Sequence, residues 1–298
     1  MEKLLVTGAN GQLGRTFLQY FAESNLSRRY VALPCDRHNM DLRNEKTVRS
    51  FLSTHQPSMI INCGGYTAVD KAEVEPEIAQ KVNSDAVACI SMWASKNKCR
   101  VIHISTDFIF DGRKSRPYLT TDPAHPSGVY GKTKLAGEKQ IKRILPRSGV
   151  IIRTSWLYSE YRNNFVKTMI KLMEKESSVG VVSDQIGSPT STHSLVALIL
   201  KVIEKEGFYG VLHWCDGACI SWYDFALEIQ RQAVKHGILK RKTLVKPIVS
   251  SEYKTLAVRP PYSVLSRGDT IRQFPMTALD WKMELNEVLG RIYKRAEI

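Results

Sequence analysis

The stretch KLLVTGANGQLG, residues 3–14, decides the fold of this 298-residue chain. A short apolar run leads into three glycines at GxxGxxG spacing, and the helix-like stretch TFLQYFAES follows. This order predicts a strand, a tight turn and a helix, whose first backbone amides and dipole can hold a pyrophosphate. The stretch therefore predicts a dinucleotide-binding unit. The cofactor contacts expected in the turn are Gly8, Asn10, Gly11, Gln12, Leu13 and Gly14.

The same strand pattern returns along the chain. The apolar runs YVALP, SMIINCGG, CRVIHISTD and GVIIRTSW end in turn residues, and helix-like segments such as 76–97 and 130–144 lie between them. Strands that alternate with helices indicate a parallel sheet covered on both faces. The predicted class is α/β, a Rossmann-like doubly wound sheet with a smaller, mostly helical C-terminal lobe.

The domain boundaries follow from where this alternation becomes irregular. Residues 1–155 are expected to form the dinucleotide-binding domain. The strand-like VGVVSD and the helix-like STHSLVALILKVIEK are expected to rejoin its sheet over about 178–212. Residues 156–177 and 213–298 are assigned to the second lobe, which would bind the substrate.

Composition limits the possible classes of protein. The chain is 43% hydrophobic, has no run of about 18 apolar residues and shows no cleavable signal pattern, so a cytoplasmic protein with no membrane contact is expected. Six scattered cysteines lack metal-site spacing and predict reduced thiols. The net charge of +14 comes from basic residues spread along the chain, which predicts a solvated basic surface that attracts a small polyanion rather than nucleic acid.

The second strand ends at two residues with opposite implications for the cofactor. Asp36 stands where a carboxylate would hold the adenosine ribose of NAD, whereas Arg37 could pair with the 2′-phosphate of NADP. The choice stays open, with NADPH favoured by the overall charge and NADH possible. Further adenine and ribose contacts are expected at Asp41, Leu42, Cys63, Gly64 and Gly65, although Cys63 is equally well explained as a small buried packing residue.

A tyrosine and a lysine stand four residues apart in VYGKTKLAGE, residues 129–138. On a helix, Tyr130 and Lys134 would share one face. A tyrosine that acts as an acid near neutral pH needs its pKa lowered by about 3 units, and a lysine charge ~4 Å away supplies energy of that order. The spacing alone usually marks a surface helix. A catalytic role for this pair is supported by Ser105 and Thr106, hydroxyl residues at the expected carboxyl end of the fourth strand.

With these residues in view, the chain resembles the extended short-chain dehydrogenase/reductases, and specifically the dTDP-4-dehydrorhamnose reductases. The matching stretches span most of the chain: VTGANGQLG, YTAVDKAE, STDFIFDG, YGKTKLAGE, RTSWLYS, NFVKTM, SDQIGSPT and RPPYSVL. The resemblance implies reduction of the C4 keto group of dTDP-4-dehydro-β-L-rhamnose, the last step of dTDP-L-rhamnose synthesis. Thr106, Tyr130 and Lys134 match the family's catalytic trio, with Tyr130 as proton donor.

The resemblance also implies the substrate contacts. Val69, Asp107 and Trp156 match positions that line the sugar site, and Asn164, Gln185 and Arg259 of the second lobe match the nucleotide side of the pocket. Arg259 is a plausible diphosphate clamp, with a surface salt bridge as its alternative.

Some positions depart from the family pattern. Tyr262 stands where a small or amide residue is frequent, so nucleobase recognition could differ. Some family members are dimers bridged by magnesium through a glutamate two places after the third glycine; this chain has Thr16 there, so no metal is predicted. A homodimer stays possible.

Other functions compete with this interpretation. A sugar-nucleotide dehydratase needs a glutamate after Asp107, where this chain has Phe108. A reductase of another nucleotide-linked 4-keto-6-deoxy sugar stays open. So does a non-catalytic NADP-binding regulatory subunit, although retention of the catalytic trio argues against it.

Overall fold

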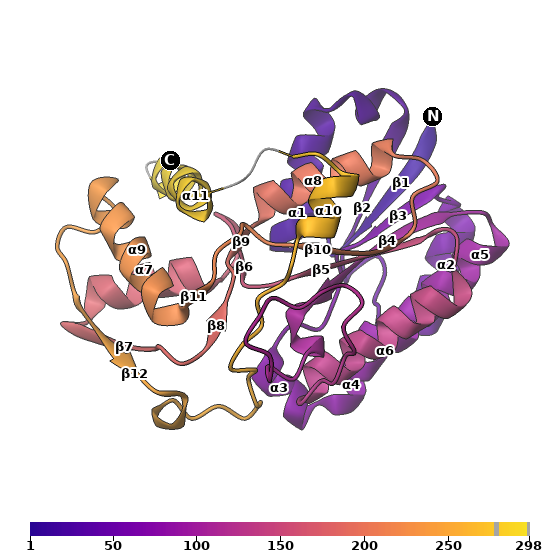
Figure 1. Ribbon diagram of the computed structural model, residues 1–298. Coiled ribbons are helices and arrows are strands. Elements are labelled where there is room, and N and C mark those ends of the chain that lie inside the picture. Colours follow the sequence, from indigo (N-terminus) through magenta and orange to yellow (C-terminus); the bar gives the residue numbers. More distant parts are fainter. Residues whose placement is uncertain (277–279, 297–298) are drawn as a thin grey trace.

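The computed structural model describes residues 1–276 and 280–296, and a six-stranded parallel sheet lies at its centre (Figure 1). The strand order is β10-β5-β4-β3-β1-β2, and every neighbouring pair is parallel. The strands are β1 (Glu2–Thr7), β2 (Tyr30–Cys35), β3 (Met59–Asn62), β4 (Arg100–Thr106), β5 (Gly149–Thr154) and β10 (Gly210–Trp214). This confirms the predicted doubly wound sheet. The chain reverses direction across the sheet between β2 and β3, and ligands bind at such a switch point.

Two layers of helices cover the sheet (Figure 1). One apolar cluster joins the strands to α1 (Gln12–Glu23), α8 (Thr192–Glu204) and α10 (Gly268–Gln273). A second cluster, on the opposite face, joins them to α2 (Glu45–His55), α5 (Ala86–Lys96) and α6 (Val129–Ile144). The short helices α3 (Val69–Val74) and α4 (Pro76–Gln80) and a π-helical turn (Lys81–Asp85) lead into α5. Strands buried on both faces explain why each reads as a continuous apolar run.

The second lobe has its own apolar core. It contains α7 (Phe165–Lys175), α9 (Trp222–Lys235), α11 (Trp281–Ala296), and the parallel pair β7 (Ser178–Val182) and β12 (Leu244–Ile248). Two short ribbons complete this region, β6 (Leu157–Tyr158) with β9 (Thr190–Ser191) and β8 (Ile186–Gly187) with β11 (Ile220–Ser221). Phe225 on α9 is fully buried among Tyr158, Phe165 and Trp281. The lobe therefore packs around aromatic side chains.

The chain passes between the two lobes at other residues than the sequence predicted. The predicted strand VGVVSD does not rejoin the central sheet, because β7 pairs with β12 in the second lobe. In β7, buried Val179 and Val181 alternate with exposed Ser178 and Gly180, which is the pattern of a ribbon with one buried face. The chain returns instead through α8 and β10, and α10 also packs on the sheet domain. The boundaries expected at 178 and 213 are therefore displaced.

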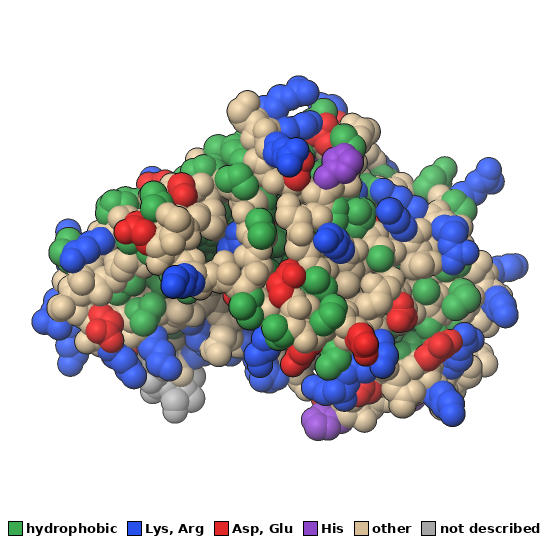
Figure 2. All heavy atoms as spheres, turned by 90° about the horizontal axis from the view of Figure 1, so that it is seen from below, with side chains coloured by type: hydrophobic (Ala, Val, Ile, Leu, Met, Phe, Trp, Pro, Cys, Tyr) green, Lys and Arg blue, Asp and Glu red, His purple; other side chains and the backbone are tan. Residues whose placement is uncertain are grey.

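The surface carries its positive charge in a dispersed form. Figure 2 shows lysine and arginine side chains spread over both lobes, with acidic side chains among them. Within the described residues, no helix is both long and apolar enough to span a bilayer.

Candidate active site

The glycine turn lies at the end of β1, beside the loop that follows β3. Gly8 has a φ of 63°, and a Cβ there would stand 2.9 Å from Gly64. A Cβ on Gly14 would stand 2.4 Å from the Gly8 carbonyl oxygen, so this position has no room for a side chain. Gly11 caps α1 without a side-chain hydrogen bond, which leaves the first amides of the helix facing the cavity. These features fit a bound pyrophosphate.

A side cavity of about 450 Å³ continues from the turn to the end of β2. It brings together predicted cofactor contacts that are distant in sequence: Gly8, Asp36, Arg37, Asp41, Leu42, Gly64 and Gly65. Cys63 lines the main cavity described below. Asn10 lines neither cavity; its side-chain amide instead donates to Asp36 Oδ2.

The side cavity also contains a residue that the sequence analysis missed. Arg43 donates from Nε to both oxygens of Asp41 at 2.9 Å, and Arg37 Nε lies 3.9 Å from the same carboxylate. Two guanidinium groups therefore meet at one wall of the side cavity. The only sequence signal for this arrangement was the basic residue two places after Asp41.

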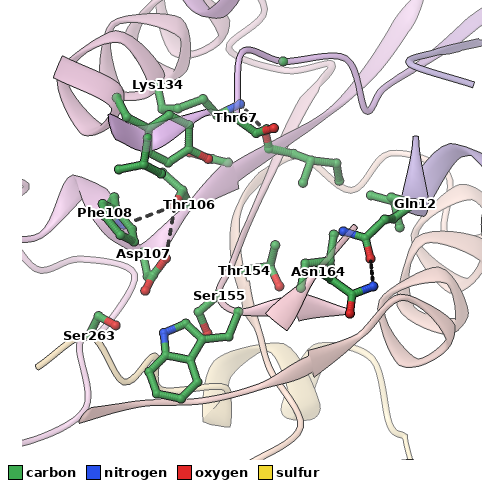
Figure 3. Close-up of a pocket in the computed structure, with 18 of the residues that line it drawn as sticks. Gln12, Thr67, Thr106, Asp107, Phe108, Lys134, Thr154, Ser155, Asn164 and Ser263 are labelled. Carbon is green, nitrogen blue, oxygen red and sulfur yellow. Dashed lines mark hydrogen bonds between the residues drawn. The ribbon is translucent and has the colours of Figure 1, made fainter. Parts of the chain in front are cut away.

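The main cavity, of about 550 Å³, lies between the glycine turn, the carboxyl ends of β4 and β5, and the second lobe (Figure 3). Every predicted catalytic and substrate residue lines it: Val69, Thr106, Asp107, Tyr130, Lys134, Trp156, Asn164, Gln185 and Arg259. Residues from both lobes therefore enclose one continuous space.

Thr106 and Asp107 form the end of the cavity at the tip of β4. The Thr106 hydroxyl donates to Asp107 Oδ1 at 3.1 Å and accepts from the Phe108 amide at 3.2 Å (Figure 3). Burial raises the pKa of Asp107 to about 6, although the Thr106 hydroxyl and the nearby Ser263 hydroxyl oppose this shift. Asp107 Oδ2 is buried and has no hydrogen-bond partner among the described residues. An unsatisfied acceptor thus lies in the wall of the cavity.

Tyr130 lies in the first turn of α6, opposite Thr106. Burial raises its pKa to about 12, the Asp107 charge adds to this shift, and the nearby Thr106 hydroxyl opposes it. Lys134 was expected to lower the pKa of Tyr130, but this expectation is wrong, because the pKa is raised. The ammonium group of Lys134 is directed elsewhere, because its Nζ donates to the Ile104 carbonyl at 2.6 Å. Burial lowers the pKa of Lys134 to about 8.

Aromatic side chains form the wall of the cavity in the second lobe. Trp156 follows β5 with a φ of 45° and stacks on Trp222 of α9, with ring centroids 3.5 Å apart. A non-glycine residue in this backbone region is uncommon and costs about 1–3 kcal/mol, so the surrounding packing holds it there. Trp222 and Ser263 also line the cavity, and neither was predicted from the sequence. The aromatic stretch ISWYDF was the available signal for Trp222.

The three residues expected on the nucleotide side hold different positions. Arg259 pairs with Asp70 of α3 at 2.9 Å, and its buried Nε has no partner within the described residues. Gln185 donates to the Ser250 hydroxyl at 2.9 Å. Asn164 caps α7 and donates to Gln12 Oε1 at 2.9 Å, so it lies beside the glycine turn. The structure therefore places Asn164 nearer to the cofactor side than the resemblance implied.

Two departures from the family pattern have structural explanations. Tyr262 is not a wall of either cavity; it packs against the cluster of Ile109, Phe110 and Leu265, while its neighbour Ser263 faces the main cavity. Thr16 is fully buried and bonds through its hydroxyl to that of Thr192 at 2.8 Å, where it joins α1 to α8.

A buried ionic network supports the catalytic end of α6. Glu138 accepts from Arg153 Nε and Nη2 on β5 at 2.9 and 2.7 Å, and from the Ser105 hydroxyl at 2.6 Å. His213 on β10 accepts from Arg153 Nη1 at 3.2 Å, and burial together with the Arg153 charge lowers its pKa to about 3. The network fixes α6 to three strands of the sheet, directly beneath Thr106.

A glycine turn built for a dinucleotide, together with a half-buried tyrosine and a buried lysine at the carboxyl edge of the sheet, defines an NAD(P)-dependent oxidoreductase of the extended short-chain dehydrogenase/reductase class. Comparison with known proteins narrows this class. A sequence model of the family described as RmlD substrate binding domain matches residues 1–294. A dTDP-4-dehydrorhamnose reductase from Aggregatibacter actinomycetemcomitans is 39% identical over 293 residues, which cover 97% of this chain and 98% of that protein.

Solved structures agree with the sequence comparison. The crystal structure of a dTDP-4-dehydrorhamnose reductase from Clostridium acetobutylicum has a TM-score of 0.89 and 38% identity, and covers 97% of this chain and 99% of its own. A dTDP-4-dehydrorhamnose reductase from Bacillus anthracis, solved in complex with NADP, has a TM-score of 0.89 and 33% identity with the same coverage. The chain belongs to the RmlD family, that of the dTDP-4-dehydrorhamnose reductases.

Proposed function

We propose that this chain uses NADPH to reduce the C4 keto group of dTDP-4-dehydro-β-L-rhamnose and so forms dTDP-L-rhamnose. The observation that carries the proposal is the single cavity that joins the glycine turn to Thr106 and Tyr130, in a chain that matches reductases of this name over nearly its whole length. Shared fold alone would not support a substrate; the site and the full-length match do.

The cofactor would lie along the two connected cavities. The amides at the start of α1 would hold its pyrophosphate, and the side cavity would hold its adenosine. Arg37 and Arg43 supply positive charge next to Asp41, which supports NADPH over NADH because a 2′-phosphate can replace the Asp41 carboxylate as their partner. When bound, the reduced nicotinamide supplies the hydride.

Side chains of the protein supply the proton for the reduction. With a pKa of about 12, Tyr130 holds its proton throughout the neutral range and gives it to the substrate oxygen only as negative charge develops there. The Thr106 hydroxyl has one proton to donate, and it can give this hydrogen bond to the same oxygen once it leaves Asp107 Oδ1. Thr106 is buried and Tyr130 is half-buried in the cavity wall, so a bound substrate and cofactor would shield the developing charge from water.

The other walls would orient the sugar nucleotide. Asp107 Oδ2 lacks a partner in the described structure and is placed to accept a hydrogen bond from a sugar hydroxyl. The Trp156 and Trp222 rings offer an apolar surface to the other side of the sugar ring. Arg259 donates one hydrogen bond to Asp70. It can give up this bond and bind the diphosphate instead.

The test is the loss of reduced-nicotinamide absorbance when purified protein is given dTDP-4-dehydro-L-rhamnose with NADPH or NADH. Tyr130→Phe should fold and bind cofactor but lose about 10²–10⁴-fold in turnover. Tyr209→Phe, a matched change at a half-exposed tyrosine remote from both cavities, should retain wild-type rates.

Failure of the assay would have two distinguishable meanings. Turnover of a different nucleotide-linked 4-keto-6-deoxy sugar would keep the reaction and change the substrate. No turnover of any such sugar by protein that binds NADPH, together with a stable complex with another enzyme on pull-down, would indicate a regulatory subunit.

A further inference from the structure

A row of buried polar side chains crosses the sheet beneath the cofactor site. Thr7 on β1 is in register with Asn62 on β3, and Asn62 is in register with His103 on β4. Residues in register on parallel strands point to the same face. All three are at most 1% exposed, and they face α6, where Lys134 is also buried. The proposed reaction assigns no role to these three side chains.

The hydrogen bonds along this row have a fixed direction. The Gly64 amide donates to Thr7 Oγ1 at 2.9 Å, and the Thr7 hydroxyl then donates to Asn62 Oδ1 at 2.6 Å. With its oxygen engaged, Asn62 presents its amino group to His103 Nδ1 at 3.0 Å. His103 Nδ1 must therefore accept, so the ring proton of the neutral imidazole is on Nε2.

This proton points at the catalytic lysine. His103 Nε2 lies 3.5 Å from Lys134 Nζ, whose other interaction is donation to the Ile104 carbonyl. An ammonium group has three donors and no acceptor, whereas a neutral amine has a lone pair that can accept from an N–H. An N–H at this position therefore disfavours the charged lysine and favours the neutral one.

We propose that His103 is a positioning residue, held in the Nε2–H tautomer by Thr7 and Asn62, that lowers the proton affinity of Lys134. In this arrangement Lys134 aims one N–H at Ile104 and keeps another for the cavity. It can then release a proton toward Tyr130 after Tyr130 has protonated the substrate, and regain one from water when product leaves. The inference rests on the proposed function for the role of Lys134, but its first test needs neither substrate nor turnover.

The other groups that face Lys134 act in opposite directions. Glu138, one turn further along α6, and the Cys63 thiol raise the pKa of Lys134, while burial lowers it more strongly. Burial and the Lys134 charge together place the pKa of His103 well below its ordinary value, so the imidazole stays neutral. Among the groups that approach Lys134 Nζ within hydrogen-bond range, His103 is the one whose effect depends on a tautomer.

The first test is the tautomer itself, read by ¹⁵N NMR of histidine-labelled protein. The chain has seven histidines, and the His103 signals are those lost in His103→Gln. We expect a protonated Nε2 and an unprotonated Nδ1 from pH 5 to 9. A protonated Nδ1 in the wild-type protein would overturn the proposal, whatever the enzyme proves to reduce.

The second test reverses the direction of the hydrogen bond between residue 62 and His103. Asn62→Asp can only accept, so it should move the ring proton to Nδ1 and turn a lone pair toward Lys134. The pH at which kcat/KM falls as Lys134 loses its proton should then rise by about one unit, a tenfold gain in proton affinity. A switched tautomer with an unmoved pH profile would refute the coupling of His103 to Lys134.

A charge control and an uncharged variant complete the design. Asn97→Asp adds the same charge at the exposed end of α5 and should change neither the tautomer nor the profile. An equal shift in this control would reduce the effect to net charge and overturn the proposal. Asn62→Leu removes the donor without adding a charge, and should lower the Nε2–H population toward that of free neutral histidine, in which both tautomers are present; an undiminished Nε2–H population would also count against the proposal.

Discussion

Replacement of Glu138 by glutamine isolates the energetic role of the buried network beneath the active site. Glu138 is fully buried, Arg153 is 2% exposed, and two hydrogen bonds join them. Removing one partner of a buried ion pair costs about 3–5 kcal/mol, because the remaining charge is left without compensation. Glutamine keeps an oxygen that can accept from Ser105 or from one arginine N–H. We therefore expect a loss at the low end of this range, about 3 kcal/mol of unfolding free energy.

The assay is equilibrium urea denaturation followed by circular dichroism, with two comparison variants. Glu45→Gln breaks the exposed Glu45–Arg49 pair of α2 and should cost less than about 0.5 kcal/mol. Glu138→Leu combined with Arg153→Met removes both charges and should recover most of the stability lost in Glu138→Gln. A Glu138→Gln loss as small as that of Glu45→Gln would refute the assignment of a buried, uncompensated charge.

Three further predictions concern the ligand sites. Gly14→Ala should abolish NADPH binding in a calorimetric titration, because the new Cβ would meet the Gly8 carbonyl oxygen at 2.4 Å; unchanged affinity would contradict the turn geometry. Arg37→Ala should raise KM for NADPH more than for NADH in steady-state assays, and equal effects would remove Arg37 from the phosphate site. Burial raises the pKa of Asp107 to about 6, so its carboxylate is charged only above that pH, and kcat/KM should fall as the pH drops through 6. Asp107→Asn should be slow and should lack this acid limb, whereas a limb that persists would belong to another group.

Much of the fold followed from local patterns in the sequence. The continuous apolar runs and the glycine turn predicted the parallel sheet and its ligand edge, because those features are set by burial and backbone sterics within a few residues. The strand at residues 178–182 was predicted, but its partner was wrong. Pairing with β12 depends on a segment more than 60 residues away, which no local pattern specifies.

In the site, too, local patterns predicted which residues meet, but not how their side chains are oriented. Thr106, Tyr130 and Lys134 were expected together and line one cavity. The spacing of Tyr130 and Lys134 sets the distance between their Cβ atoms only, whereas the flexible lysine stem carries its charge to the Ile104 carbonyl. His103 stands in an apolar run as an ordinary strand residue. Its partners depend on the register of three strands, which only tertiary structure supplies.

The stacked pair of Trp156 and Trp222 has an optical consequence. Two indole rings with centroids 3.5 Å apart are electronically coupled, so they absorb and emit as a pair rather than as independent chromophores. One ring is anchored just after β5 and the other at the start of α9, and both lie in the wall of the main cavity. Any ligand that separates or tilts the rings changes the near-ultraviolet circular dichroism and the fluorescence of the protein. The site thus carries an intrinsic spectroscopic probe of its own occupancy.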